Sequence, residues 1–529
     1  MEFKFGGSET NQKTVLGHPS GLFVLFFTEM WERFSYYGMR ALLVLFLVSS
    51  IIDQGWGWDR GDALMLYGWY TGLVYITPIL GGFIADKFMG YRNAIVLGAL
   101  IMTLGHASMA LEGITDMFFY LGLFFLIIGN GLFKPNISSM VGQLYLTQGK
   151  EKDAGYTIFY MGINAGAFLG ILLCGYIGEK VGWHYGFGLA GIFMFFGMLQ
   201  FYFAQSIFAK IGLSPKQTQD FDDVIEDSVD NVEDNIEEVI DEAKSSKVTK
   251  DRLIVIGVLA FFTIFFWWAF EQAGGSMTIF AADYTDRTLT GSGASTFKIF
   301  NTILTIVPML IITYVLAMLF KQTFKKYALS NILLGISFVI IWAIVIWMLV
   351  REFQSNETEV AASWFGILNS FFIIAFAPLF SKIWQSKYNP TGPVKFAIGL
   401  ILLGLGFGIL AFGSMGIPLG AKTASVSMIF LILAYLFHTL GELCVSPVGL
   451  SYVSKLAPAK LVGLMFGVWF VANFIANTFA GITGSYIDPI VEDYGMTTFF
   501  LIFTIIPFVA GVTMIILNKT LLRMMHGIK

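Results

Sequence analysis

Charged residues are scarce in this sequence of 529 residues: they form 13% of it, about half the share found in soluble domains. Cysteine is scarcer still, because only Cys174 and Cys444 occur. Each lies in an apolar run, which excludes a disulfide framework. The net charge of −4 provides no surplus of positive charge for a polyanionic partner. These shortages exclude a soluble enzyme, a disordered chain and a nucleic-acid-binding protein.

Apolar residues are correspondingly abundant. They make up 56% of the chain and include 54 phenylalanines, while 57 glycines provide sites where helices can approach closely. A membrane-spanning helix needs about 20 apolar residues, and fourteen runs are long enough. We therefore predict an all-α polytopic membrane protein. The predicted spans cover approximately residues 21–51, 62–85, 92–111, 116–140, 154–178, 184–209, 252–282, 297–320, 328–350, 361–384, 394–414, 425–452, 462–484 and 497–518.

Lysine and arginine are unevenly distributed between the connections of these spans. If the N-terminus is cytoplasmic, the cytoplasmic connections contain most of these residues, including Lys87, Arg92, Lys150 and Lys152. The outer connections then contain few. Because positive charge gathers on the cytoplasmic side of membrane proteins, we predict cytoplasmic N- and C-termini in an inner membrane or plasma membrane.

A polar segment at 214–251 interrupts the hydrophobic pattern. It has twelve acidic residues between Asp220 and Glu242, and its apolar residues recur at the three- and four-residue spacing of an amphipathic helix. We interpret it as a solvated tether between two membrane halves. A regulatory helix that docks a partner is the alternative.

The first span contains charges that lipid would not tolerate. An ionisable residue inside a membrane costs roughly 2.5–3.5 kcal/mol on insertion scales, so each is a candidate functional residue. At about 100° per residue, the polar side chains of this span fall within roughly 140° of one another. This face must line a cavity or a buried network, or else form a structural ion cluster. Its members are Glu29, Glu32, Arg33, Tyr36, Tyr37 and Arg40.

Three later spans contain lone charges, namely Lys134, Glu271 and Glu442. Together with the first span, the buried set has three positive and four negative groups. The extra negative charge is most cheaply neutralised by a proton on a carboxylate, whose protonation burial favours. This is the chemistry of a proton-coupled carrier.

Several motifs match one family. The pattern Glu29-x-x-Glu32-Arg33-x-x-x-Tyr37-Gly38 resembles the first-helix signature of the proton-dependent oligopeptide transporters, a branch of the major facilitator superfamily. Residues 159–166 and 441–447 resemble further motifs of that family, and 81–90 resembles the superfamily's loop motif. The resemblance implies proton-coupled symport of di- and tripeptides into the cell by alternating access, with no cofactor.

The resemblance also implies the organisation of the chain. We expect the major facilitator fold, with two six-helix bundles and two extra transmembrane helices, making 14 spans. Residues 1–210 would form the N-terminal bundle, 211–251 the acidic cytoplasmic linker and 252–529 the C-terminal bundle. The extra pair would lie at about 297–350.

Individual roles follow from the resemblance. Arg40 and Lys134 would receive the carboxylate of the peptide, and Glu442 its amino group. Arg40 with Glu271, and Lys134 with Glu442, would form gating ion pairs. Proton coupling would involve Glu29, Glu32, Arg33 and Glu271. The peptide-binding set comprises Tyr37, Arg40, Tyr75, Lys134, Asn164, Trp267, Asn369, Glu442, Ser446 and Trp469.

The sequence departs from the family in three ways. Gly68 occupies the position where many animal members have histidine, so proton coupling must depend on carboxylates. The extra helix pair follows the seventh span instead of preceding it. In addition, Ser370 replaces the proline that usually follows this asparagine in the family. Without that proline, a local break in the helix is not expected with certainty.

Three other functions are disfavoured. A carrier of nitrate or of a drug-like molecule is disfavoured because nitrate needs no amine site, and this chain has both Lys134 and Glu442. An integral-membrane enzyme would need a metal or nucleophile constellation, which the sequence lacks. A channel would need repeated pore-lining rings.

Overall fold

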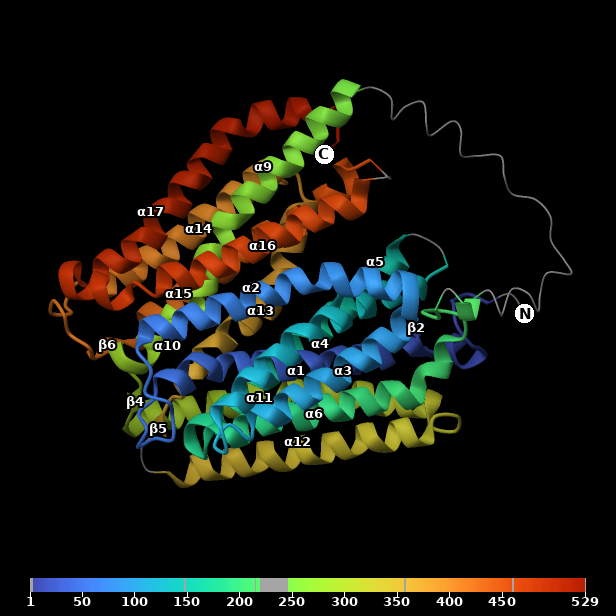
Figure 1. Ribbon diagram of the computed structural model, residues 1–529, viewed down its shortest axis with the longest axis horizontal. Helices are drawn as coiled ribbons and strands as arrows, with labels where there is room; N and C mark the ends of the chain where they lie inside the picture. The colour runs from blue at the N-terminus through green and yellow to red at the C-terminus, as the bar shows by residue number, and fades with distance from the viewer. Residues whose placement is uncertain are drawn as a thin grey trace, which may run out of the picture.

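The computed structural model describes residues 3–146, 149–214, 216–218, 246–355, 358–458 and 461–528. Long helices lie side by side in two groups (Figure 1). The first group comprises α1 (Ser20–Val48), α2 (Arg60–Ile84), α3 (Gly90–Met109), α4 (Asp116–Gln143), α5 (Lys150–Lys180) and α6 (Trp183–Ala204). The second comprises α9 (Ser246–Phe270), α13 (Ile367–Gln385), α14 (Gly392–Gly413), α15 (Met428–Leu456), α16 (Val462–Gly484) and α17 (Ile487–Met524).

Shorter elements connect these helices. The turns are η1 (Glu9–Gln12), η2 (Ala85–Met89), η3 (Gln205–Phe208), η4 (Glu271–Gly274), η5 (Phe280–Tyr284) and η6 (Ala362–Gly366), and α10 spans Ser276–Ile279. β1 (Thr14–Val15) pairs with β2 (His18–Pro19), β3 (Thr285–Asp286) with β6 (Val426–Ser427), and β4 (Thr288–Leu289) with β5 (Thr358–Glu359). In Figure 1 both termini lie toward one end of the molecule, which we call the terminal end. β4, β5 and β6 lie at the opposite end, the β end.

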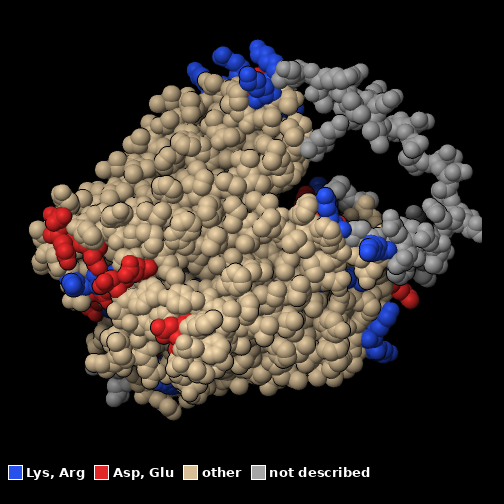
Figure 2. All heavy atoms as spheres, viewed as in Figure 1, with Lys and Arg blue, Asp and Glu red and all other residues tan. Residues whose placement is uncertain are grey.

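The fold is that of a multi-pass membrane protein. Twelve helical stretches of the described chain are long and apolar enough to cross a membrane. One of them, residues 60–109, contains both α2 and α3. α1 is a further helix of 29 residues that carries the charge cluster of the first span. Together these make the fourteen spans predicted from hydropathy. Charged side chains gather at the two ends, and the band between them is almost uncharged (Figure 2).

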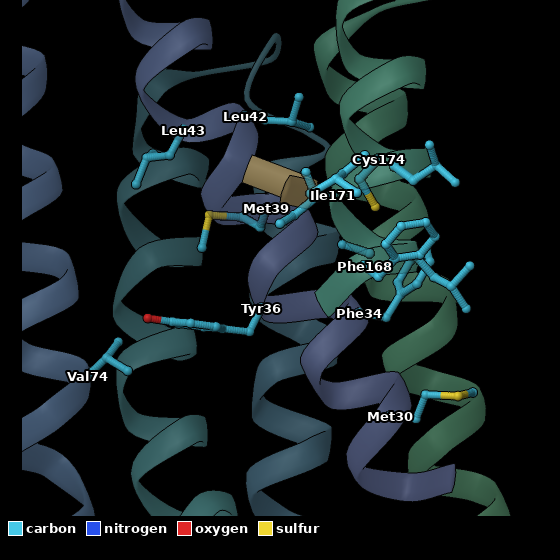
Figure 3. Close-up of a cluster of buried hydrophobic side chains, with 14 of the residues drawn as sticks. Met30, Phe34, Tyr36, Met39, Leu42, Leu43, Val74, Phe168, Ile171 and Cys174 are labelled. Carbon is cyan, nitrogen blue, oxygen red and sulfur yellow. The ribbon is translucent and has the colours of Figure 1, made fainter. Parts of the chain in front are cut away.

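Glycine determines how closely α1 and α5 approach. Gly162, Gly166 and Gly170 recur every four residues along α5 and face α1. A Cβ at Gly166 would lie 2.9 Å from Arg33 Cβ, so only glycine allows this spacing. Figure 3 shows the apolar side chains beside this contact, among them Phe34 of α1 and Cys174 of α5. This tight packing fixes the charged face of α1 inside the first group.

A hairpin of α11 (Gly291–Thr323) and α12 (Ala328–Gln354) is the predicted extra helix pair. In the sequence it follows the seventh span, within the predicted 252–529 unit. In space α12 packs against the first group: the Phe338 ring lies 5.6 Å from that of Trp31, and Ser330 donates a hydrogen bond of 2.7 Å to the Gln200 carbonyl. The hairpin is therefore attached to the bundle that precedes it in the chain.

The two groups meet closely where α2 crosses α16. A Cβ at Gly68 would lie 2.8 Å from the backbone nitrogen of Gly481. This contact explains why position 68 is glycine in this chain, because no side chain fits there. Most of the predicted acidic linker, residues 219–245, lies outside the described residues, so the division at 211–251 stays a prediction.

Candidate functional site

A central cavity of about 290 Å³ lies between the two groups of helices. This volume is just below the usual range for small-molecule sites, about 300–1,000 Å³. Eight of the ten residues predicted to bind a peptide line it, and Glu271 lines it as well. They are Tyr37, Arg40, Tyr75, Asn164, Trp267, Asn369, Glu442 and Ser446, which come from α1, α2, α5, α9, α13 and α15.

The other two predicted residues lie outside this lining. The Lys134 ammonium group lies 4.6 Å from the centre of the Tyr75 ring, so it is one side chain away from the cavity. Trp469 is buried between α15 and α16, because a Cβ at Gly449 would lie 3.2 Å from its Cε2. Tyr75 therefore stands between Lys134 and the cavity in this conformation.

Glu442 forms the acidic pole of the cavity. Asn369 Nδ2 donates hydrogen bonds to Glu442 Oε2 over 2.8 Å and to Thr439 Oγ1 over 3.2 Å. Asn369 lies in the first turn of α13, which continues through Ser370 without a break. The described contacts include no ion pair between Glu442 and Lys134, so the second predicted gating pair is not formed in this conformation.

Arg40 and Glu271 form an ion pair at the other pole. Arg40 is on α1, and Glu271 begins η4, directly after α9 ends, so the pair joins the two groups. Arg40 Nε also donates to the Tyr67 hydroxyl over 2.7 Å. The predicted ion pair of Arg40 and Glu271 is thus present, with Tyr67 as a third member that the sequence did not indicate, and its gating role stays a prediction.

Further polar contacts close the β end of the molecule. Arg60 at the start of α2 binds Asp283 over 2.6 Å and Asp488 over 3.0 Å, both on the second group. Glu359 of β5 binds Lys180 over 2.5 Å and Arg287 over 3.0 Å. At the terminal end the two groups separate and the surface is hollowed (Figure 2). The cavity is therefore closed at the β end.

Glu359 of β5 lies outside the membrane-spanning segments. Partial burial would raise its pKa, but the hydrogen bond from Lys180 and the charge of Arg287 outweigh burial and lower it. This carboxylate therefore stays ionised at pH values below those at which an ordinary glutamate becomes protonated. Its two ion pairs persist at those pH values.

Glu29, Glu32 and Arg33 form a separate cluster inside the first group. Arg33 Nε lies 2.8 Å from Glu29 Oε1 and 2.5 Å from Glu32 Oε2, and all three residues are at most 3% exposed. Asn130 of α4 donates a hydrogen bond of 3.0 Å to Glu32. None of these residues lines the cavity. The predicted site residues thus divide into a cavity between the groups and a charge cluster within one of them.

Sequence reasoning missed several residues at both places. Asn130 lies one helical turn before Lys134 and is a polar residue within an apolar run. This pattern in the sequence could have marked it as a candidate site residue. Tyr67 had no such signal, because tyrosine is common near membrane interfaces. The other missed residues that line the cavity include Tyr160, Ser363, Tyr435 and His438.

Two helical groups around a buried, charged cavity that is closed at one end define a class: membrane carriers with the major facilitator fold. The chain belongs to the POT family, whose family model matches residues 92–358 and 336–499. The "Di-/tripeptide transporter" of Lactococcus lactis (strain IL1403) is 30% identical over 98% of this chain and 99% of its own. The "Peptide transporter YePEPT" of Yersinia enterocolitica is 31% identical over 90% of this chain and 89% of its own.

Solved structures are similar over nearly the whole chain. A peptide transporter POT in complex with sulfate has a TM-score of 0.72 and 29% identity, with 97% of each chain covered. A POT family transporter in complex with 5-aminolevulinic acid has a TM-score of 0.73 and 26% identity, covering 96% of this chain and 98% of that one.

Proposed function

We propose that this protein imports di- and tripeptides together with protons, by alternating access. The observation that carries the proposal is the cavity between the two groups of helices, which has Glu442 at one pole and Arg40 at the other. A small peptide is a zwitterion with variable side chains, so a general carrier must bind its two charged ends. The names of the relatives, a di-/tripeptide transporter and a peptide transporter, support the same substrate class.

Each pole suits one end of a peptide. The peptide carboxylate binds Arg40, with Lys134 nearby behind Tyr75, and the amino group binds Glu442. Hydrogen bonds to the peptide backbone come from Tyr37, Tyr75, Asn164 and Asn369, and the walls include Trp267 and Ser446. Trp469, buried between α15 and α16, lies outside this lining. These assignments use the two ends and the backbone, which all di- and tripeptides share, so they suit many different peptides.

Binding of a peptide also competes with closure of the β end. Arg40 is paired with Glu271 in the observed conformation, and Glu442 with Asn369. A peptide carboxylate or ammonium group can replace these partners. Glu271 is then released and, with Glu29, Glu32 and Arg33, belongs to the proton-coupling set. The proton gradient drives transport, and neither a cofactor nor an enzymatic reaction is required.

The terminal end faces the cytoplasm in this proposal, and the membrane is the inner or plasma membrane. Lysine and arginine gather at the terminal end in the view of Figure 2, and acidic residues at the β end. Positive charge favours the cytoplasmic side. The observed conformation would then be closed to the outside, with lipid around its apolar band.

Uptake of radiolabelled dialanine into proteoliposomes tests the proposal. A gradient that is acidic outside should drive accumulation above an empty-vesicle control, and a protonophore should abolish it. Nitrate uptake in the same vesicles tests the rival substrate, for which Glu442 has no role. Absence of dialanine uptake in correctly inserted protein would refute the proposal.

A further inference from the structure

Asn130 makes a direct contact with the proton-coupling cluster. Its Nδ2 donates a hydrogen bond of 3.0 Å to Glu32 Oε1, and the exposed fractions of the two residues are 1% and 0%. The other polar atom of the amide, Oδ1, has no hydrogen-bond partner in the described part of the chain. A buried amide oxygen without a partner is costly and calls for an explanation.

The backbone holds Asn130 firmly in place. Gly129 and Gly131 flank it on α4 and bring that helix against its two neighbours. A Cβ at Gly129 would lie 2.6 Å from the Gly98 carbonyl oxygen of α3, and one at Gly131 would lie 2.7 Å from Thr77 Cβ of α2. The amide can therefore turn about its own side-chain bond while its Cα stays fixed beside Glu32.

The two protonation states of Glu32 need opposite partners. An ionised carboxylate only accepts hydrogen bonds, whereas a protonated carboxyl group also donates one. An amide has a donor and an acceptor at its two ends. A half-turn of the Asn130 amide replaces the nitrogen beside Glu32 with the oxygen. Because Oδ1 has no hydrogen-bond partner among the described residues, this turn breaks only the bond from Nδ2 to Glu32.

None of the other groups near Glu32 is observed to hydrogen-bond in a way that would suit both its ionised and its protonated state. Glu29 and Arg33 act on it from α1, Lys134 from α4 and Tyr70 from α2. Arginine and lysine are donors only, so they stabilise the ionised form alone. The Tyr70 hydroxyl makes no hydrogen bond within the described chain. Glu29 is joined to Arg33 and has no amide partner among the described contacts.

We propose that Asn130 is a positioning residue that satisfies Glu32 in both protonation states. It donates to the ionised carboxylate, and after a half-turn it accepts from the protonated one. Glu32, rather than Glu29, is then the carboxylate that takes a proton from water on one side of the membrane and returns it to water on the other. This inference rests on the proposed proton-coupled transport.

The test compares how variants of Asn130 affect the accumulation of dialanine and the exchange of dialanine. Asn130→Leu removes both functions of the amide. Asn136→Leu is the matched control, because Asn136 is equally buried on α4 but donates only to its own helix, to the Leu132 carbonyl. Proteoliposomes report two quantities: accumulation of radiolabelled dialanine driven by a pH gradient, and exchange of dialanine without a gradient.

We expect Asn130→Leu to lower accumulation at least about tenfold, as loss of a hydrogen bond to a charged group predicts, while exchange stays within about twofold. Asn136→Leu should retain both. In a Glu32→Gln background, which already lacks the titrating group, Asn130→Leu should cause no further loss of accumulation. Asn130→Asp has the same size and should also lose accumulation, because a carboxylate cannot donate to ionised Glu32.

Either of two results would overturn the inference. One is accumulation within about twofold of wild type in both Asn130 variants. The other is equal loss of accumulation and exchange in both, which would assign Asn130 a structural role. If the wild-type protein neither accumulates nor exchanges dialanine, the proposed function itself is wrong, and that outcome appears before any variant is made.

Discussion

Arg40 of α1 and Glu271 of η4 form an ion pair that joins the two helical groups at one pole of the cavity, and both are largely buried. The two residues are 231 positions apart in the sequence. Because the pair crosses from one group to the other, we predict that it exists only while the β end is closed.

Removing one partner of this pair should favour opening of the β end. Glu271→Gln leaves the Arg40 charge buried without a counterion, which costs roughly 3–5 kcal/mol in the closed state. We expect a longer distance between spin labels at Ile52→Cys and Leu419→Cys, two exposed positions at the β end. The charge reversal Arg40→Glu with Glu271→Arg should shorten it again. An unchanged distance in Glu271→Gln would show that the pair does not hold the β end closed.

The hydroxyl of Tyr67 contributes to the same closure. Tyr67→Phe removes the oxygen that accepts from Arg40 Nε and leaves the ring in place. Loss of a hydrogen bond to a charged group costs about 1.5–3 kcal/mol, so we expect a smaller shift of the label distance than in Glu271→Gln. Tyr185→Phe, at an exposed tyrosine, is the control. A shift as large in the control would point to a nonspecific effect.

Glu442→Gln should abolish peptide uptake. The ammonium group of the peptide would lose the carboxylate at that pole, while Asn369 could still bind the new amide and preserve the fold. Loss of one member of a buried charge pair costs roughly 3–5 kcal/mol. Dialanine binding by isothermal titration calorimetry measures the effect, and Glu492→Gln, at an exposed acid of the β end, is the control. Wild-type affinity in Glu442→Gln would exclude the amine-binding role.

Glu32→Gln should separate proton coupling from peptide binding. The amide keeps the shape of the side chain but cannot change its charge. We expect loss of accumulation driven by a pH gradient, with much of the dialanine exchange retained. Glu29→Gln is the companion variant. Intact accumulation in both single variants and in the double variant would place the proton elsewhere, with Glu271 beside Arg40 as the next candidate.

Glu359 makes closure of the β end sensitive to acid. Its pKa is lowered in the closed state because the hydrogen bond from Lys180 and the charge of Arg287 outweigh the effect of burial. A lowered carboxylate pKa stabilises the closed state at pH values above the ordinary one, near 4.5, and this stabilisation disappears as the pH falls through the lowered pKa. Closure should therefore be steady from neutral pH to about 5 and weaken below about 4.5.

The label distance at Ile52→Cys and Leu419→Cys, followed from pH 8 to 4, checks this expectation. Glu359→Gln should remove the acid-dependent change that this residue causes. It should also weaken closure slightly at neutral pH, because half-exposed ion pairs contribute about 0–1 kcal/mol each. A change of the same size in wild type and Glu359→Gln would assign the acid sensitivity to other groups.

The sequence alone determined the class of this protein and the charged face of its first span. Apolar runs of sufficient length mark membrane helices because the requirement is local to each run. Glu29, Glu32 and Arg33 could be placed on one face because helical periodicity relates residues within a few positions. The motifs then indicated the family, and eight of the ten predicted binding residues line one cavity.

The tertiary structure alone decided which of these residues meet. Tyr67 joins Arg40, Asn130 joins Glu32, and Arg60 binds Asp488 over 428 positions of sequence. No local pattern reports such contacts, because they depend on how helices cross and which glycines let them approach. Lys134 and Glu442 were predicted to pair, but the described contacts include no ion pair between them, and Lys134 lies over the Tyr75 ring instead. Composition and periodicity describe each helix separately, whereas the site forms only where helices from both groups pack together.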